Sequence, residues 1–240
     1  MKLNSILPSI LLIGFGLLIN GCGQSAENDT AADRAELASV HPQLDTVCPE
    51  SCPCTGRWML EPDSLPAHWL GVKWKGRILL EPINLLISDS LATSRTESRQ
   101  ALRDALSAAG FPSRSLHSGG YMGMIGDSIY PQLPDEKDHA FSNQFAAFGN
   151  IHGRVFGPRY INGVYWYTAA FSREKLSPFS KIKHAYDSFI RARDEVSQKL
   201  DQKGSFSISK TIDLQNKISG DSLFTTGDHD GRAILLTRQK

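Results

Sequence analysis

The sequence predicts an α+β fold, with a mixed β-sheet of about five to six strands and two main helices packed on one face. Short apolar or alternating runs predict the strands, and two amphipathic stretches with capping residues predict the helices. The order is strand, helix, two strands, helix, two strands. A hydrophobic fraction of 40% in 240 residues is sufficient for a globular core.

The first elements are expected between residues 77 and 110. Residues 77–80 and 82–88 are apolar runs separated by Glu81 and Pro82, a pattern typical of an edge segment followed by a buried strand. A helix is expected to begin at Ser94, which forms a capping box with Glu97, and to stop at Gly110. Alanine and leucine recur along one side of this helix at helical spacing.

The middle of the chain is expected to hold a long loop and a hairpin. Residues 117–150 contain several glycines and prolines, which predict an irregular segment of the kind that often faces a ligand. Two strands are expected at 154–156 and 164–172. Asn162 and Gly163 between them form the dipeptide most typical of a tight hairpin turn.

The last elements are a helix and two strands. Asp187 is the expected N-cap of a helix that runs to about residue 200, with Gly204 beyond its end. Residues 205–214 alternate in polarity and predict a strand. Residues 233–237 predict the final one.

The N-terminus indicates export and a lipid anchor. The apolar run from Ile6 to Ile19 spans about 21 Å as a helix, which is too short to cross a membrane core of about 30 Å. Leu18 to Cys22 resembles a bacterial lipobox, which implies a signal peptide over residues 1–21 and acylation of Cys22. A plain secretory signal with an unmodified Cys22 is the alternative.

The chain beyond the signal divides into three further parts. Residues 22–47 are the lipidated cysteine and a polar tether, 48–80 a Cys/Trp-rich extension, and 81–240 the α+β domain. Gly23 stands where an Asp would mark inner-membrane retention, so the periplasmic face of the outer membrane is expected in a diderm cell. The membrane is then a partner through the lipid anchor. Nucleic acid is not expected, because the net charge is only +1.

From Glu81 onward, an ordered set of short motifs resembles the LssY C-terminal domain family. The motifs cover residues 82–87, 106–111, 138–141, 151–156, 165–173, 184–194 and 230–234. Family members often carry paired histidines before the Arg-bearing strand and before the second helix, and each pair is here reduced to one, His152 and His184. The resemblance implies a fold and a candidate patch but names no substrate.

That patch is the first candidate site. If His152 opens a strand and His184 precedes a helix, both can face one cleft, with Arg154 two residues along on the same strand face as His152. Asp187 is expected to orient His184. Two imidazoles and a guanidinium suit a phosphate, a carboxylate or half of a metal site. The alternative is that both histidines cap loops and bond to the backbone.

The second candidate site is the motif formed by Cys48, Cys52 and Cys54. It resembles the copper motif of Sco-type assembly proteins, and thiolates do select Cu(I), with His41 or His68 as a third ligand. An oxidising compartment favours a disulfide instead. A bridge between Cys48 and Cys54 would close seven residues and contribute about 2 kcal/mol, and the pairing stays open.

These features predict a non-catalytic envelope module that binds an anionic ligand or a protein partner through the 117–154 segment and the His152/Arg154/His184 patch, with no cofactor. Copper or thiol-redox handling at the cysteines is the alternative. A hydrolase of phosphorylated lipid or headgroup is a further alternative, which rests on the membrane phosphatase-like segments found beside the family. The commonest hydrolase and NTPase motifs do not occur in this sequence.

Overall fold

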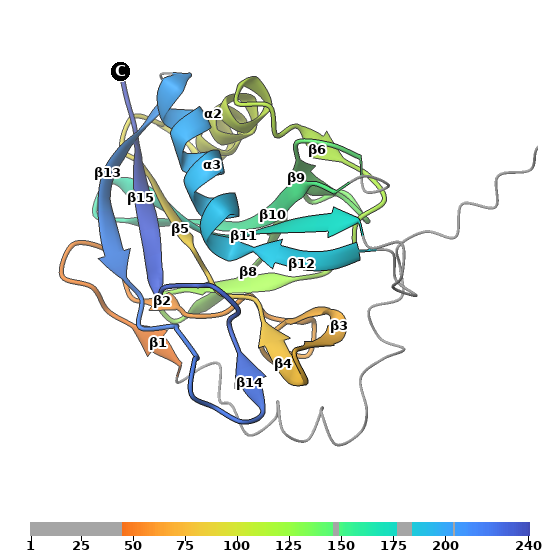
Figure 1. The fold of residues 1–240 in the computed structure, drawn as a ribbon. Coiled ribbons are helices and arrows are strands. Elements are labelled where there is room, and N and C mark those ends of the chain that lie inside the picture. The colour runs from red at the N-terminus through yellow and green to blue at the C-terminus, as the bar shows by residue number, and fades with distance from the viewer. Residues whose placement is uncertain (1–44, 146–148, 177–183, 204) are drawn as a thin grey trace, which may run out of the picture.

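The computed structural model describes residues 45–145, 149–176, 184–203 and 205–240. The expected signal peptide, Cys22, His41 and the tether up to residue 44 lie outside the described residues. The described part contains fifteen strands and two helices (Figure 1). The prediction of an α+β fold with about five to six strands is therefore wrong, because the molecule is mostly β.

The two helices are α2 (Arg95–Ala108) and α3 (Phe189–Gln202). The strands, in chain order, are β1 (Thr46–Val47), β2 (Thr55–Gly56), β3 (His68–Trp74), β4 (Arg77–Leu80), β5 (Leu85–Asp89), β6 (Ser113–Arg114), β7 (Met122–Ile125), β8 (Ser128–Leu133), β9 (Ala140–Ser142), β10 (Ile151–Ile161), β11 (Val164–Leu176), β12 (His184–Ser188), β13 (Phe206–Asp213), β14 (Phe224–Thr225) and β15 (Arg232–Arg238).

Twelve of the strands form one curled sheet. Nine follow the order β1-β2-β7-β8-β10-β11-β5-β15-β13, while β12 pairs with β11, and β9 pairs with β10 and β6. A second sheet has the order β14-β4-β3. The pairs β15–β5 and β14–β4 are parallel and the other named pairs are antiparallel.

The segment expected to be an irregular loop contains three of these strands. In the β7–β8 hairpin, Gly123 lies where a Cβ atom would stand 2.4 Å from the ring of Phe156, so only glycine admits that ring. Gly126 has a φ of 65° and lies in the turn. Pro131 lies opposite Met122 within the pair. Glycine and proline thus mark close packing and a turn here, rather than loss of structure.

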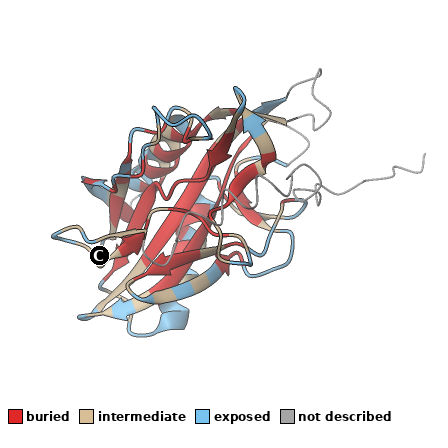
Figure 2. Cartoon of the chain, turned by 90° about the horizontal axis from the view of Figure 1, so that it is seen from below, coloured by how far each residue is buried: buried red, intermediate tan, exposed pale blue. Residues whose placement is uncertain are grey.

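The hairpin of β10 and β11 is the longest pairing in the sheet. Ile161 lies opposite Val164, and the turn residues Asn162 and Gly163 have φ of 50° and 83°, as a tight two-residue turn requires. Both strands are longer than expected. The burial view shows long buried strands through the centre of the molecule (Figure 2).

Both helices pack into one core cluster with the sheet. Ser94 caps α2 by accepting a hydrogen bond from the Glu97 amide at 3.1 Å, as expected, but the Glu97 carboxylate accepts from the Thr93 amide instead of Ser94. Helix α3 is capped by Ser188 and not by the predicted Asp187. Neither described helix combines the length and the apolar run that a membrane crossing requires.

Residues 48–80 pack into the same body as the rest of the described chain. Met59 and Ala67 share a core cluster with Phe156 of β10. Trp58 packs with Ile78 in a second cluster. Further contacts come from β2, which pairs with β7. This segment therefore helps to bury the sheet face opposite the helices.

Candidate functional site

The site is built on one face of the β10–β11 pair. His152 lies directly opposite Ser172, and Arg154 opposite Ala170. Because side chains alternate along a strand, Asn150, His152 and Arg154 project to the same side, together with Ser172 and Glu174 of β11. The Glu174 amide donates to the carbonyl of Asn150 at 2.9 Å, which extends the pairing beyond the start of β10.

The histidine on β10 is buried and neutral. His152 is 5% exposed, its Nδ1 lies 2.9 Å from Asn150 Oδ1, and its Nε2 lies 3.5 Å from Ser172 Oγ. The amide oxygen can only accept, so Nδ1 carries the proton. Burial, and then the nearby Arg154 charge, hold the pKa of His152 well below its ordinary value.

The arginine of the site is almost completely enclosed. Arg154 is 2% exposed, and its Nη2 donates to the Ser118 carbonyl at 2.6 Å and to the Ser118 hydroxyl at 3.3 Å. Its Cζ lies 5.0 Å from the Tyr121 ring centre. The charge of Arg154 acts on the buried acid Glu81. Burial raises the pKa of Glu81 to about 7, and Arg154 opposes that rise.

The second predicted histidine joins the same site through a glutamate. His184 Nδ1 lies 3.0 Å from Glu174 Oε1, and the same oxygen lies 3.9 Å from His152 Nδ1. Contact with Glu174 raises the pKa of His184 above its ordinary value. The side chain of Glu174 is 4% exposed, so it links the two histidines inside the protein.

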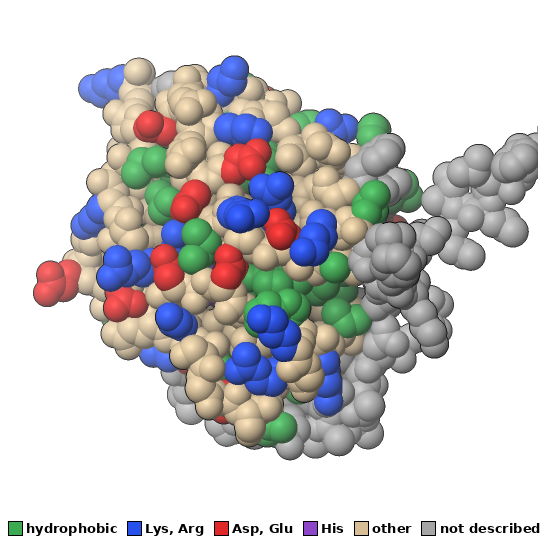
Figure 3. Space-filling model, in the orientation of Figure 1, with side chains coloured by type: hydrophobic (Ala, Val, Ile, Leu, Met, Phe, Trp, Pro, Cys, Tyr) green, Lys and Arg blue, Asp and Glu red, His purple; other side chains and the backbone are tan. Residues whose placement is uncertain are grey.

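Asp187 does not belong to this group. Its carboxylate pairs with Arg173 at 3.2 Å, with Arg191 at 3.8 Å and with Lys175 at 3.9 Å. The expectation that Asp187 orients His184 is therefore wrong, and Glu174 occupies that position. Acidic and basic side chains are interspersed over α3 on the surface in Figure 3.

A third histidine completes the site. The His117 ring centre lies 5.1 Å from that of His152, and the two planes are tilted by 34°. Burial, followed by the Arg154 charge, lowers the pKa of His117 to about 3, so this ring is neutral at pH 7. We call the group His117, His152, Arg154, Glu174 and His184 the His–Arg cluster.

Several polar atoms in and beside the His–Arg cluster have no partner. Among the residues that the structure describes, buried atoms without a hydrogen bond include His117 Nε2, Arg154 Nε and the neighbouring Asn150 Nδ2. Each such atom costs free energy, typically about 1–3 kcal/mol. Three of them on neighbouring side chains indicate a place where another polar molecule would be stabilised.

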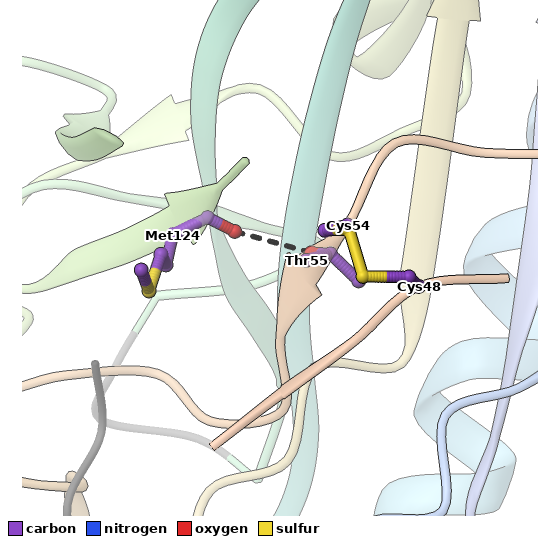
Figure 4. Close-up of a disulfide and its surroundings, with 4 residues drawn as sticks. All are labelled: Cys48, Cys54, Thr55 and Met124. Carbon is purple, nitrogen blue, oxygen red and sulfur yellow. Dashed lines mark hydrogen bonds between the residues drawn. A yellow bond between two sulfur atoms is a disulfide. The ribbon is translucent and has the colours of Figure 1, made fainter. Parts of the chain in front are cut away.

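The cysteine motif forms a different arrangement. Cys48 and Cys54 form a disulfide (Figure 4). Cys52 is a free, partly buried thiol. The bridge precedes Thr55, whose hydroxyl donates to the Met124 carbonyl at 3.1 Å. Burial raises the pKa of Cys52, which lowers its thiolate fraction.

Among the described cysteines, the disulfide leaves one thiol, Cys52, for a metal. Of the two proposed third ligands, His68 has its Nε2 2.7 Å from the Val72 carbonyl, and His41 lies outside the described residues. Within the described ranges, no group of three or more His, Cys, Asp or Glu side chains is arranged to hold a metal ion.

Sequence reasoning found two of the three histidines and the arginine, and the structure brings these together. It missed His117, Glu174 and Glu81. Glu174 had a signal, because the alternation that places Ser172 on the face of His152 continues by one step to Glu174. His117 had none, since its contact depends on the loop before β7.

Comparison with protein-family models, curated proteins and solved structures gives no match for this chain.

Proposed function

We propose that this chain is an envelope lipoprotein, anchored through Cys22, whose β-rich domain binds a small anionic ligand at the His–Arg cluster without catalysis. The anchor and the resemblance to the LssY C-terminal domain family rest on the sequence alone. The observation that carries the proposal is Arg154, a guanidinium that is 2% exposed and whose Nε has no hydrogen-bond partner among the described residues.

The energetics support a ligand more than a structural role. Taking a charge out of water costs several kcal/mol unless partners compensate it. Among the described residues, Arg154 contacts the Ser118 oxygens and the Tyr121 ring. Glu81 interacts with it electrostatically, but a pKa of about 7 leaves Glu81 partly neutral at pH 7. A bound anion would supply both the missing charge and the missing hydrogen-bond acceptors.

The donors suit an oxyanion. A guanidinium presents N–H groups in a planar fork that matches a carboxylate or a phosphate. Within the described part of the chain, Asn150 Nδ2 is a donor without an acceptor, and His117 Nε2 belongs to the ring that lies tilted against that of His152. An anion beside Arg154 would raise the pKa values of both neutral histidines, so that protonation adds further donors as pH falls.

The test is calorimetric titration of the mature chain, residues 22–240 carrying Cys22→Ser, which has neither the apolar signal peptide nor the acyl chains and so needs no detergent. Acetate and orthophosphate are the probes. We expect at least one of them to bind, and Arg154→Ala to weaken that binding at least tenfold. Arg191→Ala is the matched control, since that side chain is 67% exposed. Binding that survives in Arg154→Ala, or no binding of either probe to a folded protein, would overturn the proposal.

A second candidate function is hydrolysis of a phosphorylated lipid or headgroup, and one observation favours it. Ser172 Oγ, His152 and Asn150 follow one another at 3.5 Å and 2.9 Å, in the order nucleophile, base and orienting group. Turnover of bis(p-nitrophenyl) phosphate that is lost in both Ser172→Ala and His152→Ala would establish it. No turnover by the folded wild type would exclude it for phosphodiesters.

Copper or thiol-redox handling is the remaining alternative, and the disulfide between Cys48 and Cys54 gives it no specific support. Metal analysis after reduction decides it. Copper bound in stoichiometric amount and lost in Cys52→Ser would favour this function over anion binding.

A further inference from the structure

A free thiol and a disulfide lie in the same short loop. In the pair of β1 and β2, Val47 lies opposite Thr55. Cys48 and Cys54 come next on the two sides, and their disulfide closes the loop between the strands (Figure 4). The loop inside this bridge has five residues, and Cys52, the free cysteine of the described residues, is one of them. Since thiolates attack disulfides, the loop contains a nucleophile beside its target.

The backbone keeps Cys52 close to both bridged cysteines. Cys54 is two residues away, so the two Cα atoms are at most about 7.6 Å apart. Cys48 is four residues away, but the Cys52 amide donates to the Pro49 carbonyl at 3.3 Å, which folds the intervening chain into a turn. Disulfides join cysteines whose Cα atoms are up to about 6.8 Å apart, so the chain allows Cys52 to reach either partner.

The Cys52 side chain is not locked into the core. One part of it packs against the core cluster that contains Phe156. The side chain also lines a cavity of about 320 Å³ between the loop and the tip of the β10–β11 hairpin, whose walls include Ile161 and Trp166. This space allows the thiol to change rotamer, which an attack on a neighbouring sulfur requires.

The surroundings of Cys52 set the pH at which it reacts. Burial raises the pKa of the thiol, while a hydrogen bond with the Ser51 side chain and the charge of Lys210 on β13 lower it by less. The acid Glu50 borders the same cavity. The pKa therefore lies above its ordinary value, so the attacking thiolate is scarce in acid and more abundant as pH rises.

From this placement of a free thiol inside the loop of a disulfide, we propose that Cys52 exchanges with the bridge between Cys48 and Cys54. The Cys52 thiolate attacks Sγ of Cys48, the bond to Cys54 Sγ breaks, and Cys54 leaves as a thiolate that takes up the proton lost by Cys52. The products are a Cys48–Cys52 bridge and a free Cys54, so the step needs no oxidant or reductant. Attack on Cys54 is disfavoured, because the new ring would close around Pro53, whose φ is fixed.

The exchange changes how β1 is joined to the rest of the domain. The present bridge links Cys48, which follows β1, to Cys54, which precedes β2. Cys54 is fixed to the β7–β8 turn, since its carbonyl accepts from the Gly126 amide at 2.6 Å. After exchange, the contacts that hold β1 are its pairing with β2 and the ion pair of Asp45 with Arg57 at 3.1 Å. The covalent cross-link between the two strands is then lost, independently of the His–Arg cluster.

The test locates the free thiol in the mature chain, residues 22–240 carrying Cys22→Ser, which has no cysteines besides the three of the loop. Protein purified at pH 5 is held for a day at pH 8.5, quenched in acid and alkylated with N-ethylmaleimide, and tandem mass spectrometry locates the label. We expect at least about a tenth of the label to move from Cys52 to Cys54, because loops of five and seven residues differ little in closure entropy. Cys52→Ser is the matched control and should carry no label.

Two further variants identify the sulfur that is attacked. Cys54→Ser leaves Cys48 and Cys52, which should form a bridge. Cys48→Ser leaves Cys52 and Cys54, which should stay reduced. Label confined to Cys52 after a day at pH 8.5 would overturn the proposal, as would a Cys54→Ser protein that is folded by circular dichroism and stays reduced. Neither result bears on anion binding, which the titration with acetate and orthophosphate decides separately.

Discussion

The two faces of the β10–β11 pair are equally buried and chemically opposite. On the side of the helices lie Val155, Ala169 and Phe171, each at most 1% exposed. On the other side lie His152 at 5% and Arg154 at 2%. The same strands, in the same register, thus build an apolar core on one face and an enclosed polar group on the other.

The two faces differ in how completely their buried atoms are packed or hydrogen-bonded. On the apolar face, Gly153 has no Cβ because a Cβ there would stand 2.4 Å from the Phe171 ring, so packing is close. On the polar face, some buried donors of the described residues have no acceptor there. Burial on the first face stabilises the fold, whereas burial on the second costs free energy that a ligand would recover. Four variants test this contrast.

The largest effect is expected on the apolar face. Phe171→Ala should lower the free energy of unfolding by about 3–5 kcal/mol, because it removes a fully buried ring and leaves a cavity between the sheet and the helices. Urea unfolding followed by circular dichroism measures it. Phe145→Ala is the control and should change stability little, since Phe145 is 55% exposed. Similar losses in the two variants would contradict the assignment of this face to the core.

The next effect concerns Glu81, the buried acid whose charge interacts with that of Arg154. The folded pKa of Glu81, about 7, lies above its ordinary value of 4.5, so the folded state holds the proton more tightly and loses stability as pH rises between these values. Glu81→Gln should therefore gain stability relative to wild type as pH rises. Its free energy of unfolding, measured against that of wild type, should be about 2–3 kcal/mol higher at pH 8 than at pH 5.

Unfolding of both proteins at the two pH values measures this difference. Glu50→Gln is the control, because Glu50 is exposed. A gain that is the same at pH 5 and pH 8 would show that Glu81 is not a strained acid. A gain at pH 8 alone would show that Glu81 destabilises the fold when it is ionised.

The elements that the sequence predicted correctly are those marked by residues close together in the chain. Ser94 and Glu97 located α2, and Asn162 and Gly163 located the hairpin turn, because caps and turns depend on neighbouring residues. The extent of the sheet was missed, because Gly123 is a glycine for the sake of Phe156, 33 positions away. Composition alone cannot distinguish such a glycine from one in a loop.

The candidate site shows the same limit. His152 and Arg154 are two residues apart on one strand, so strand periodicity placed them correctly on one face. Asp187 was assigned to His184 from proximity in sequence, but the β11–β12 pairing turns it towards Arg173 and brings Glu174 to the histidine. Partners contributed by another strand require the register, which a single sequence does not supply.

A smaller effect should follow from breaking this pair. The pKa of His184 is raised in the fold, so its contact with Glu174 stabilises the protein fully below about pH 6.5 and less as pH rises through the folded pKa. His184→Gln should cost about 1–2 kcal/mol at pH 6 and less at pH 9. Asp187→Asn is the control for the sequence-based assignment. If it, and not His184→Gln, removed the pH dependence, Glu174 would not be the partner.

The smallest loss of stability is expected at Ser172, which is next to Phe171, where the largest loss is expected. Its hydroxyl lies 3.5 Å from His152 Nε2, a long contact, so Ser172→Ala should cost less than about 1 kcal/mol although the side chain is 1% exposed. Parallel urea curves for Ser172→Ala and Phe171→Ala compare two buried neighbours on opposite faces. If both lost several kcal/mol, the polar face would be as important to folding as the core. The cost of its unpaired donors would then no longer argue for a ligand.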